Sequence, residues 1–266
     1  MDFLRSLKKN KELIWFLAKD DIKKRYAGSS LGIIWAFAQP LVTIIIYWFV
    51  FQIGLRSVAP GQYTNMPFLV WIMCGFIPWF FFSEAWASAS NCLFEYSFLV
   101  KKVLFKIELL PFIKIVSSMF VHVFFIDLIF IFFATYGYTV NIYNLQIIYY
   151  VLCEVIFVYA LVLITSSIAV FIRDTLQVIG ILNQIFFWTI PIVWMESNIS
   201  NQIILRILKL NPIYYFVEGF RNSMIDHKWF WQNPIYSLYF WLVTIFILIV
   251  GIGINKRLKK YFADLL

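Results

Sequence analysis

The sequence predicts an all-α integral membrane protein with six transmembrane helices. Hydrophobic residues make up 62% of its 266 residues and charged residues 14%, whereas soluble domains are nearer to half apolar and a quarter charged. A soluble protein of this length could not bury so much apolar surface. The composition therefore excludes a soluble enzyme and a soluble nucleic-acid-binding domain, and we expect the net charge of +8 to face anionic lipid headgroups.

Six apolar segments come close to or exceed the roughly 20 residues that a helix needs to cross a membrane. The first, the fifth and the sixth contain no charged residue. The predicted spans are Leu31–Ile53, Pro67–Ser90, Pro111–Tyr136, Leu145–Ile172, Leu176–Met195 and Pro234–Asn255. Little sequence lies between them, so we expect residues 1–266 to form a single transmembrane domain.

The basic residues predict how this bundle is oriented. The segments before the first span, between the second and third, between the fourth and fifth, and after the sixth hold 16 Lys and Arg residues. The opposite loops hold 5. Because basic loops remain on the cytoplasmic side, we expect both termini in the cytoplasm.

Residues 1–30 predict an amphipathic helix that lies in the headgroup plane. Ile14, Ala18 and Ile22 recur at helical spacing, and Lys19 and Lys23 fall on or beside the opposite face. An ordinary solvated helix is the alternative.

Two further segments predict short helices outside the spans. Residues 91–110 carry an apolar stripe beside a charged side, which is typical of a cytoplasmic helix that docks on a soluble partner or rests on lipid. Residues 196–233 carry too many charges for further spans, and Asn211-Pro212 divides them, so we expect two short helices in the outer leaflet. Lys114, near the inner end of the third span, is expected to extend toward the interface.

Catalytic and metal-binding motifs are missing from the sequence. No Gly precedes a Lys, so a phosphate-binding loop of the Gly-x-x-x-x-Gly-Lys type is excluded and the chain does not hydrolyse ATP itself. The three cysteines form no Cys-x-x-Cys pair, and only two histidines are present. We therefore expect no catalytic residue, no metal and no cofactor in this chain.

The run from Asp21 to Trp35, DIKKRYAGSSLGIIW, followed by Pro40, resembles the opening signature of type-2 ATP-binding-cassette permeases. It is similar to the branch that exports cell-surface polysaccharides and polyol phosphates. The Phe171–Asp174 turn and the stretch from Asn211 to Arg221 are also similar to that family. Lys106, which follows Phe105, departs from the family, because many relatives carry Pro at this position.

The resemblance implies a homodimer in the bacterial cytoplasmic (inner) membrane with two soluble ATPase subunits that bind ATP and Mg. The cargo would be a polymer on a polyprenyl diphosphate or similar lipid. Residues 91–110 would form the coupling helix and residues 196–233 the outer gate. The implied contacts are Lys23, Lys24, Arg25 and Tyr26 for the lipid headgroup; Trp35, Trp48, Trp79, Glu84 and Trp86 for the translocation path; Glu95, Phe98, Leu99, Lys101 and Lys102 for the ATPase; and Asn211, Pro212, Glu218 and Arg221 for the gate.

Alternatives remain at this point. The basic cluster at residues 23–25 is equally well explained by membrane topology alone. For any single tryptophan, lipid-facing packing or a place in an interfacial aromatic belt is the better explanation. A membrane-embedded lipid-modifying transferase and an ATP-independent secondary transporter are the competing functions. O-antigen, capsular polysaccharide and teichoic acid compete as the polymer.

Overall fold

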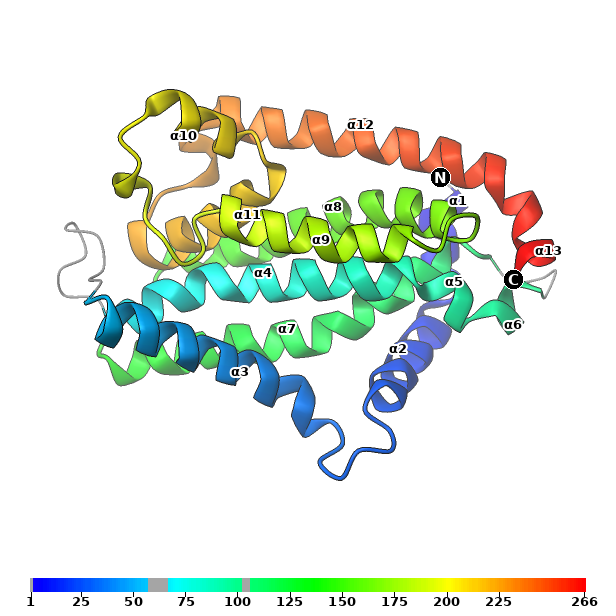
Figure 1. The fold of residues 1–266 in the computed structure, drawn as a ribbon, viewed down its shortest axis with the longest axis horizontal. Helices are drawn as coiled ribbons and strands as arrows, with labels where there is room; N and C mark the ends of the chain where they lie inside the picture. Colours follow the sequence, from blue (N-terminus) through cyan, green and yellow to red (C-terminus); the bar gives the residue numbers. More distant parts are fainter. Residues whose placement is uncertain (1, 57–66, 102–105) are drawn as a thin grey trace.

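The computed structural model describes residues 2–56, 67–101 and 106–266, and these fold almost entirely into helices (Figure 1). The α-helices are α1 (Asp2–Lys9), α2 (Lys11–Arg25), α3 (Ile34–Trp48), α4 (Phe68–Ser90), α5 (Cys92–Glu95), α6 (Ser97–Val100), α7 (Leu109–Thr135), α8 (Gln146–Ala169), α9 (Thr175–Thr189), α10 (Gln202–Lys209), α11 (Pro212–Arg221), α12 (Pro234–Leu258) and α13 (Phe262–Leu265). Short π-helical or 3-10 turns follow or link them at Phe49–Gly54, Ile142–Leu145, Glu196–Asn198, Asn222–Asp226, Phe230–Gln232 and Lys259–Tyr261.

Five helical segments of the described chain are long and apolar enough to cross a membrane. They are Ile34–Gly54, Phe68–Ser90, Leu109–Thr135, Ile142–Ala169 and Pro234–Leu265, close to the first four predicted spans and the sixth. These predictions are confirmed to within a few residues at most ends, because an uninterrupted apolar run must bond its backbone internally as helix.

The fifth predicted span differs, because α9 ends at Thr189 instead of Met195. Ile190 is extended, with φ −95° and ψ 140°, and it precedes Pro191. A residue before proline is pushed out of the helical region, which explains the early end. At 1.5 Å per residue, the 15 residues of α9 reach only about 22 Å.

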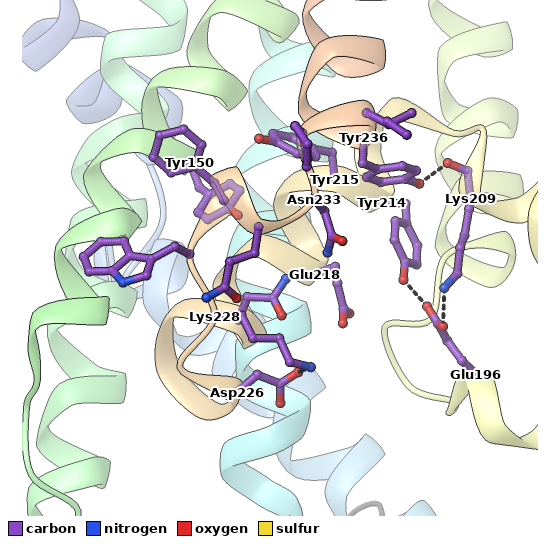
Figure 2. A pocket seen from close by; sticks show the side chains of 16 residues that line it. Tyr150, Glu196, Lys209, Tyr214, Tyr215, Glu218, Asp226, Lys228, Asn233 and Tyr236 are labelled. Carbon is purple, nitrogen blue, oxygen red and sulfur yellow. Dashed lines mark hydrogen bonds and ion pairs between the residues drawn. The ribbon is translucent and has the colours of Figure 1, made fainter.

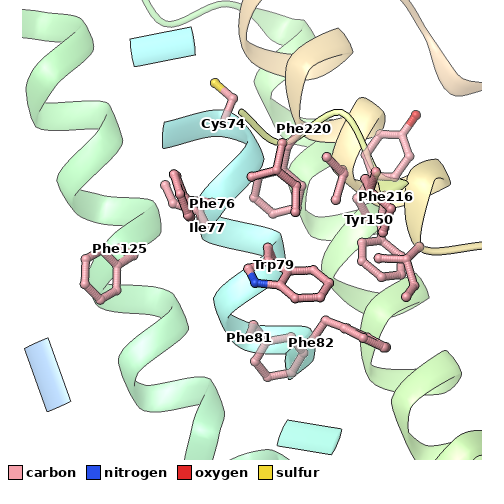
Figure 3. Close-up of a cluster of buried hydrophobic side chains, with 14 of the residues drawn as sticks. Cys74, Phe76, Ile77, Trp79, Phe81, Phe82, Phe125, Tyr150, Phe216 and Phe220 are labelled. Carbon is pink, nitrogen blue, oxygen red and sulfur yellow. The ribbon is translucent and has the colours of Figure 1, made fainter. Parts of the chain in front are cut away.

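Helix α4 lies in the middle of the bundle, where it contacts α3, α7, α8, α9 and α11. In its apolar window 78% of the residues are buried, against 11% for the segment that contains α3. Figure 3 shows Phe76, Ile77, Trp79 and Phe82 of α4 among buried rings of the neighbouring helices. Helix α4 is therefore the core element, and α3 lies at the periphery with much of its apolar surface exposed.

Both chain termini lie at one end of the bundle and α10 lies at the other (Figure 1). We call these the terminal end and the α10 end. A second, smaller core occupies the terminal end, where Ile14 and Ala18 of α2 pack with Leu93 of α5 and Phe262 of α13. This core ties the first and last helices of the chain together.

The predicted amphipathic N-terminal helix is divided into α1 and α2 at Asn10. Ile14, Ala18 and Ile22 of α2 are buried, and α2 packs against α7. Trp15 and Phe16 remain exposed, at 57% and 67%. Helix α2 thus uses one apolar face for packing and keeps a second apolar face for its surroundings.

Candidate functional site

Two basic side chains, Arg25 and Lys114, contact Asp21, and each of them also contacts a second carboxylate. Helical spacing places Asp21 and Arg25 on one face of α2, where Asp21 Oδ2 lies 3.2 Å from Arg25 Nη2. Lys114 of α7 donates to Asp21 Oδ1 at 2.5 Å and also contacts Glu95. Arg25 contacts Glu84 of α4 in addition. We call Asp21, Arg25, Glu84, Glu95 and Lys114 the charge network.

The charge network corrects the expectation that Lys114 extends to the membrane interface. The Lys114 side chain is 3% exposed, and its ammonium group is held between two carboxylates. Tyr96 adds a hydrogen bond, since its hydroxyl donates to Asp21 Oδ1 at 3.0 Å. A buried charge is tolerated where it is paired and hydrogen-bonded in this way, so the chain contributes its own partners for Lys114.

Pairing outweighs burial at Asp21 and Arg25. Burial alone would raise the pKa of Asp21, but the ion pair and hydrogen bond with Lys114 hold that pKa below its usual value. Burial likewise opposes the charge on Arg25, and Glu84 and Asp21 together raise the pKa of this guanidinium. Both groups are therefore ionised at neutral pH.

A cavity of about 200 Å³ opens beside Arg25, between α2, α3, α4 and α7. Four of the residues singled out from the sequence line it together: Arg25, Tyr26, Trp35 and Glu84. We call it the headgroup cavity. A guanidinium, a phenol, an indole and a carboxylate at one opening can bind a ligand that carries both an anionic group and a polar ring.

Other polar groups of the headgroup cavity come from the membrane-spanning helices. Its further polar lining includes Gln39, Thr43, Ser83, Ser118 and His122. The Ser118 hydroxyl is buried and has no hydrogen-bond partner within the described part of the chain. A free buried hydroxyl costs stability unless something binds it, so this cavity retains unused hydrogen-bonding capacity.

A second cavity of about 300 Å³ lies on the other side of Arg25. Lys24, Glu95, Phe98 and Lys114 contribute to its lining. Arg25 lines both cavities, and the charge network separates them. Lys23 is exposed and lines neither of these two cavities, while Lys24 pairs with Asp20 at 2.8 Å.

The tryptophans predicted for the translocation path separate into two groups. Trp35 is 46% exposed and lines the headgroup cavity, and Trp48 is half-buried. Trp79 and Trp86 are 6% and 3% exposed, because they pack among the rings of the α4 core. This structure therefore leaves neither Trp79 nor Trp86 a free face for a sugar ring.

The predicted cytoplasmic helix at residues 91–110 is not a single helix. The described residues form two one-turn helices, α5 and α6, that meet at Tyr96, and α7 has already begun at Leu109. Tyr96 is turned inward to Asp21, which explains the break. Phe98 is 54% exposed, Leu99 is half-buried, and Lys101 is exposed. Lys102 lies outside the described residues.

The residues predicted for the outer gate lie at the α10 end. Asn211 caps α11, since its side chain accepts from the Ile213 amide at 3.0 Å, and Pro212 occupies the first turn. Glu218 lines a cavity described below.

Arg221, another of the residues implied for the gate, lies inside the bundle. It is buried, donates to the Ile192 carbonyl at 3.0 Å and stacks on the Trp71 ring at 4.1 Å. Gly75 makes the room, because a Cβ there would lie 2.9 Å from the guanidinium. Arg221 therefore fixes α11 against α4, and its pair with Glu218 is long, at 3.7 Å.

Sequence reasoning missed the role of Asp21. Its spacing of four from Arg25 and the isolated cation in the third span were both visible, and an isolated intramembrane charge requires a partner. What the sequence could not supply was the docking of α2 on α7, which brings these groups together.

Comparisons with known proteins place the chain among transport proteins. The family model "ABC-2 type transporter" matches residues 12–225. The chain is similar to an O-antigen export system permease protein RfbA of Klebsiella pneumoniae, 26% identical over 261 residues, covering 96% of this chain and 95% of the relative. It is also similar to the protein of the same name from Myxococcus xanthus, 24% identical, with 98% of both chains covered. A second Klebsiella pneumoniae protein of that name is 27% identical, with 96% and 95% covered.

Proposed function

Because the chain belongs to the ABC-2 type transporter family, we propose that it is the membrane subunit of an ATP-driven exporter of lipid-linked cell-surface polysaccharide. The relatives match this chain over almost their whole length and are named O-antigen export system permeases. Their names favour O-antigen over capsular polysaccharide and teichoic acid as the cargo. A separate ATP-binding-cassette subunit binds ATP and Mg and hydrolyses the ATP.

The headgroup cavity is the observation that carries the proposal. A polymer on a polyprenyl diphosphate presents an anionic diphosphate followed by a sugar. Arg25 can bind the diphosphate, and Trp35 and Tyr26 can contact the first sugar. Arg25 and Glu84 are paired while no ligand is bound. Arg25 would therefore release Glu84 when the diphosphate binds.

Assembly as a homodimer with two ATPase subunits fits the exposed surfaces. Helices α3 and α9 expose large apolar side chains, including Trp35, Ile45, Ile181 and Trp188. A second copy and lipid would cover them, and α9 with the residues after it would complete six crossings. The exposed Phe98 of α6 is the proposed ATPase contact.

The α10 end is proposed as the outer gate. Helices α10 and α11 are short, and Asn211-Pro212 joins them, so they suit a mouth that closes over an emerging polymer. Both termini lie at the opposite end of the bundle, which fits their proposed cytoplasmic location and the basic bias of the sequence.

The test is polymer export in cells of the source organism. Deleting the gene for this chain should abolish surface polysaccharide, and the wild-type chain should restore it. Arg25→Gln should lower the export rate about tenfold or more, because removing a charge-assisted contact costs about 1.5–3 kcal/mol. Lys23→Gln is the matched control, since Lys23 is exposed and lines neither the headgroup cavity nor its neighbour.

Each result separates the possibilities. Unchanged surface polysaccharide in the deletion strain would refute the proposed function. Equal export by the two variants, at equal membrane levels, would mean that residues 23–25 act only through topology. Arg25→Lys should retain part of the export activity because it preserves the positive charge. It should not retain all of it, because a lysine lacks the planar guanidinium that binds a phosphate through two hydrogen bonds.

A further inference from the structure

A third cavity lies at the α10 end, formed by other helices than those around the headgroup cavity. It has a volume of about 750 Å³, within the roughly 300–1,000 Å³ typical of small-molecule sites. Residues of α11, the turns after it and the beginning of α12 form most of its wall (Figure 2). We call it the far cavity.

Aromatic side chains make up much of the wall of the far cavity. They are Tyr150, Tyr214, Tyr215, Trp229, Phe230 and Tyr236. Tyr150, Tyr214 and Tyr215 are almost fully buried, so the rings that can offer a surface to a ligand are those of Trp229, Phe230 and Tyr236, which are half-buried. Apolar rings of this kind match the C–H face of a sugar ring.

Polar side chains of the far cavity can bind hydroxyl groups. Asn222, Gln232 and Asn233 contribute amides, and no hydrogen bond of these three side chains is present among the described residues. Each amide offers both a donor and an acceptor, as a sugar hydroxyl requires. The wall thus combines stacking surfaces with free hydrogen-bonding groups.

The charges of the far cavity favour a neutral or cationic ligand over an anion. Both lysines are already paired, Lys209 with Glu196 at 2.6 Å and Lys228 with Asp226 at 3.2 Å. Figure 2 shows Glu218 between these two pairs. Its nearest cation, Arg221, is 3.7 Å away and is held by the Ile192 carbonyl.

Glu218 is therefore the acceptor that the far cavity leaves open. The described wall holds three carboxylates, Glu196, Glu218 and Asp226, and its two lysines are each already paired with one of them, so it offers a phosphate group no free cation. A hydroxyl that donates to a carboxylate makes a charge-assisted hydrogen bond, which is stronger than a neutral one.

We propose that the far cavity binds a saccharide segment of the exported polymer, through its aromatic wall and Glu218. This inference rests on the proposed function and refines it. The part of the cargo that the far cavity binds is a sugar polymer, not a polyol phosphate such as teichoic acid. A site at the end opposite the headgroup cavity would hold the emerging chain and oppose its return.

The test uses the complete exporter, with its ATPase, in lipid nanodiscs. The probe is the surface polysaccharide of the source organism, purified and freed of its lipid, and binding is measured by thermophoresis. We expect saturable binding, weakened about tenfold by Glu218→Gln and by Trp229→Leu, since each removes one main contact. Trp15→Leu is the matched control, because Trp15 is exposed at the terminal end.

Three outcomes overturn the inference. Absence of binding to the wild-type exporter, or equal binding by all variants, refutes the far cavity as a saccharide site. Displacement of the polysaccharide by soluble glycerol phosphate would make the cavity a phosphate headgroup site instead. The deletion strain is the separate readout. If it still exports polysaccharide, the proposed function fails. If it does not export polysaccharide and the binding test is negative, the proposed function stands and only the saccharide site is refuted.

Discussion

Lys114 Nζ lies 2.5 Å from the Asp21 carboxylate, although 93 positions separate the two residues in the sequence. This pair joins α2 to α7, and Glu84 and Glu95 extend the connection to α4 and α5. The headgroup cavity and the proposed ATPase contact both adjoin this network. The charge network therefore contributes residues to both places, Arg25 and Glu84 to the first and Glu95 and Lys114 to the second.

Removing one member of the buried pair should destabilise the fold. Lys114→Met leaves Asp21 buried without its main partner, and breaking such a pair costs about 3–5 kcal/mol. The double variant Lys114→Met/Asp21→Leu removes both charges and should recover most of the loss. Denaturant unfolding in detergent measures the difference. A double variant no more stable than the single one would contradict the buried pairing.

Acid should weaken the same pair. The pKa of Asp21 is lower in the folded protein than its ordinary value, so the unfolded chain binds more protons as pH falls. The stability from Asp21 is then fully present above about pH 4 and lost as pH falls through the folded pKa. Melting temperatures from pH 6 to pH 3 should fall more steeply for wild type than for Lys114→Met/Asp21→Leu. Parallel curves would refute this contribution.

The exposed Phe98 should matter more to ATPase binding than the neighbouring charge. Phe98→Ala should cost about 2 kcal/mol or more of binding, and Lys101→Glu a fraction of that. Co-purification of the ATPase with each variant measures the effect. Phe16→Ala is the control, because Phe16 is also a largely exposed phenylalanine but lies on α2. Leu99→Ala should also lower stability, since Leu99 packs on the smaller core. Undiminished ATPase retention and export by a Phe98→Ala/Leu99→Ala variant would refute the contact.

Gly219 should tolerate no side chain. A Cβ at this position would lie 2.1 Å from the Tyr150 ring, so Gly219→Ala must displace a buried aromatic. Overpacking of this kind costs about 1–3 kcal/mol. Gly180→Ala in α9 is the control, because no heavy atom outside its own helix lies within 4 Å of its Cβ. A melting temperature for Gly219→Ala at or above that of Gly180→Ala would contradict the packing of α11 on α8.

Topology can be tested with labels at the two ends of the bundle. A reporter fused after Leu266 should be active only in the cytosol. A cysteine in place of Ser200, next to α10, should react with a membrane-impermeant reagent added outside the cells. Reaction of Ser200→Cys only in inverted vesicles would reverse the proposed orientation.

The spans could be predicted because each rests on local information. Long apolar runs and the prolines at 212 and 234 identify where helices lie and begin. Pro191 also carried the signal that ends α9 early, and the prediction overlooked it. These features require only neighbouring residues.

The ion pairs and buried charges required tertiary information. Lys114 was expected near the interface and Arg221 at the outer gate, and both are buried because distant segments offer them partners. Arg221 needs the Trp71 ring and the space left by Gly75 in α4. No periodicity in the sequence indicates which helix will contact which. Arg25, Tyr26 and Trp35, in contrast, line one cavity because only a short connection separates α2 from α3, although Glu84 joins them from the distant α4.

The pairing of Lys114 with Asp21 has a consequence for biosynthesis. Ribosomes add about 5–20 residues per second, so the 93 positions between the two correspond to about 5–20 s of synthesis. During this time α2 has been made but its partner helix α7 has not. Asp21 must wait at the membrane surface without Lys114 until the third span is inserted, with Arg25 beside it, while Arg25 can already pair with Glu84 once α4 has been made. Slow translation between codons 25 and 114 would lengthen this interval and expose the nascent chain to quality-control proteases.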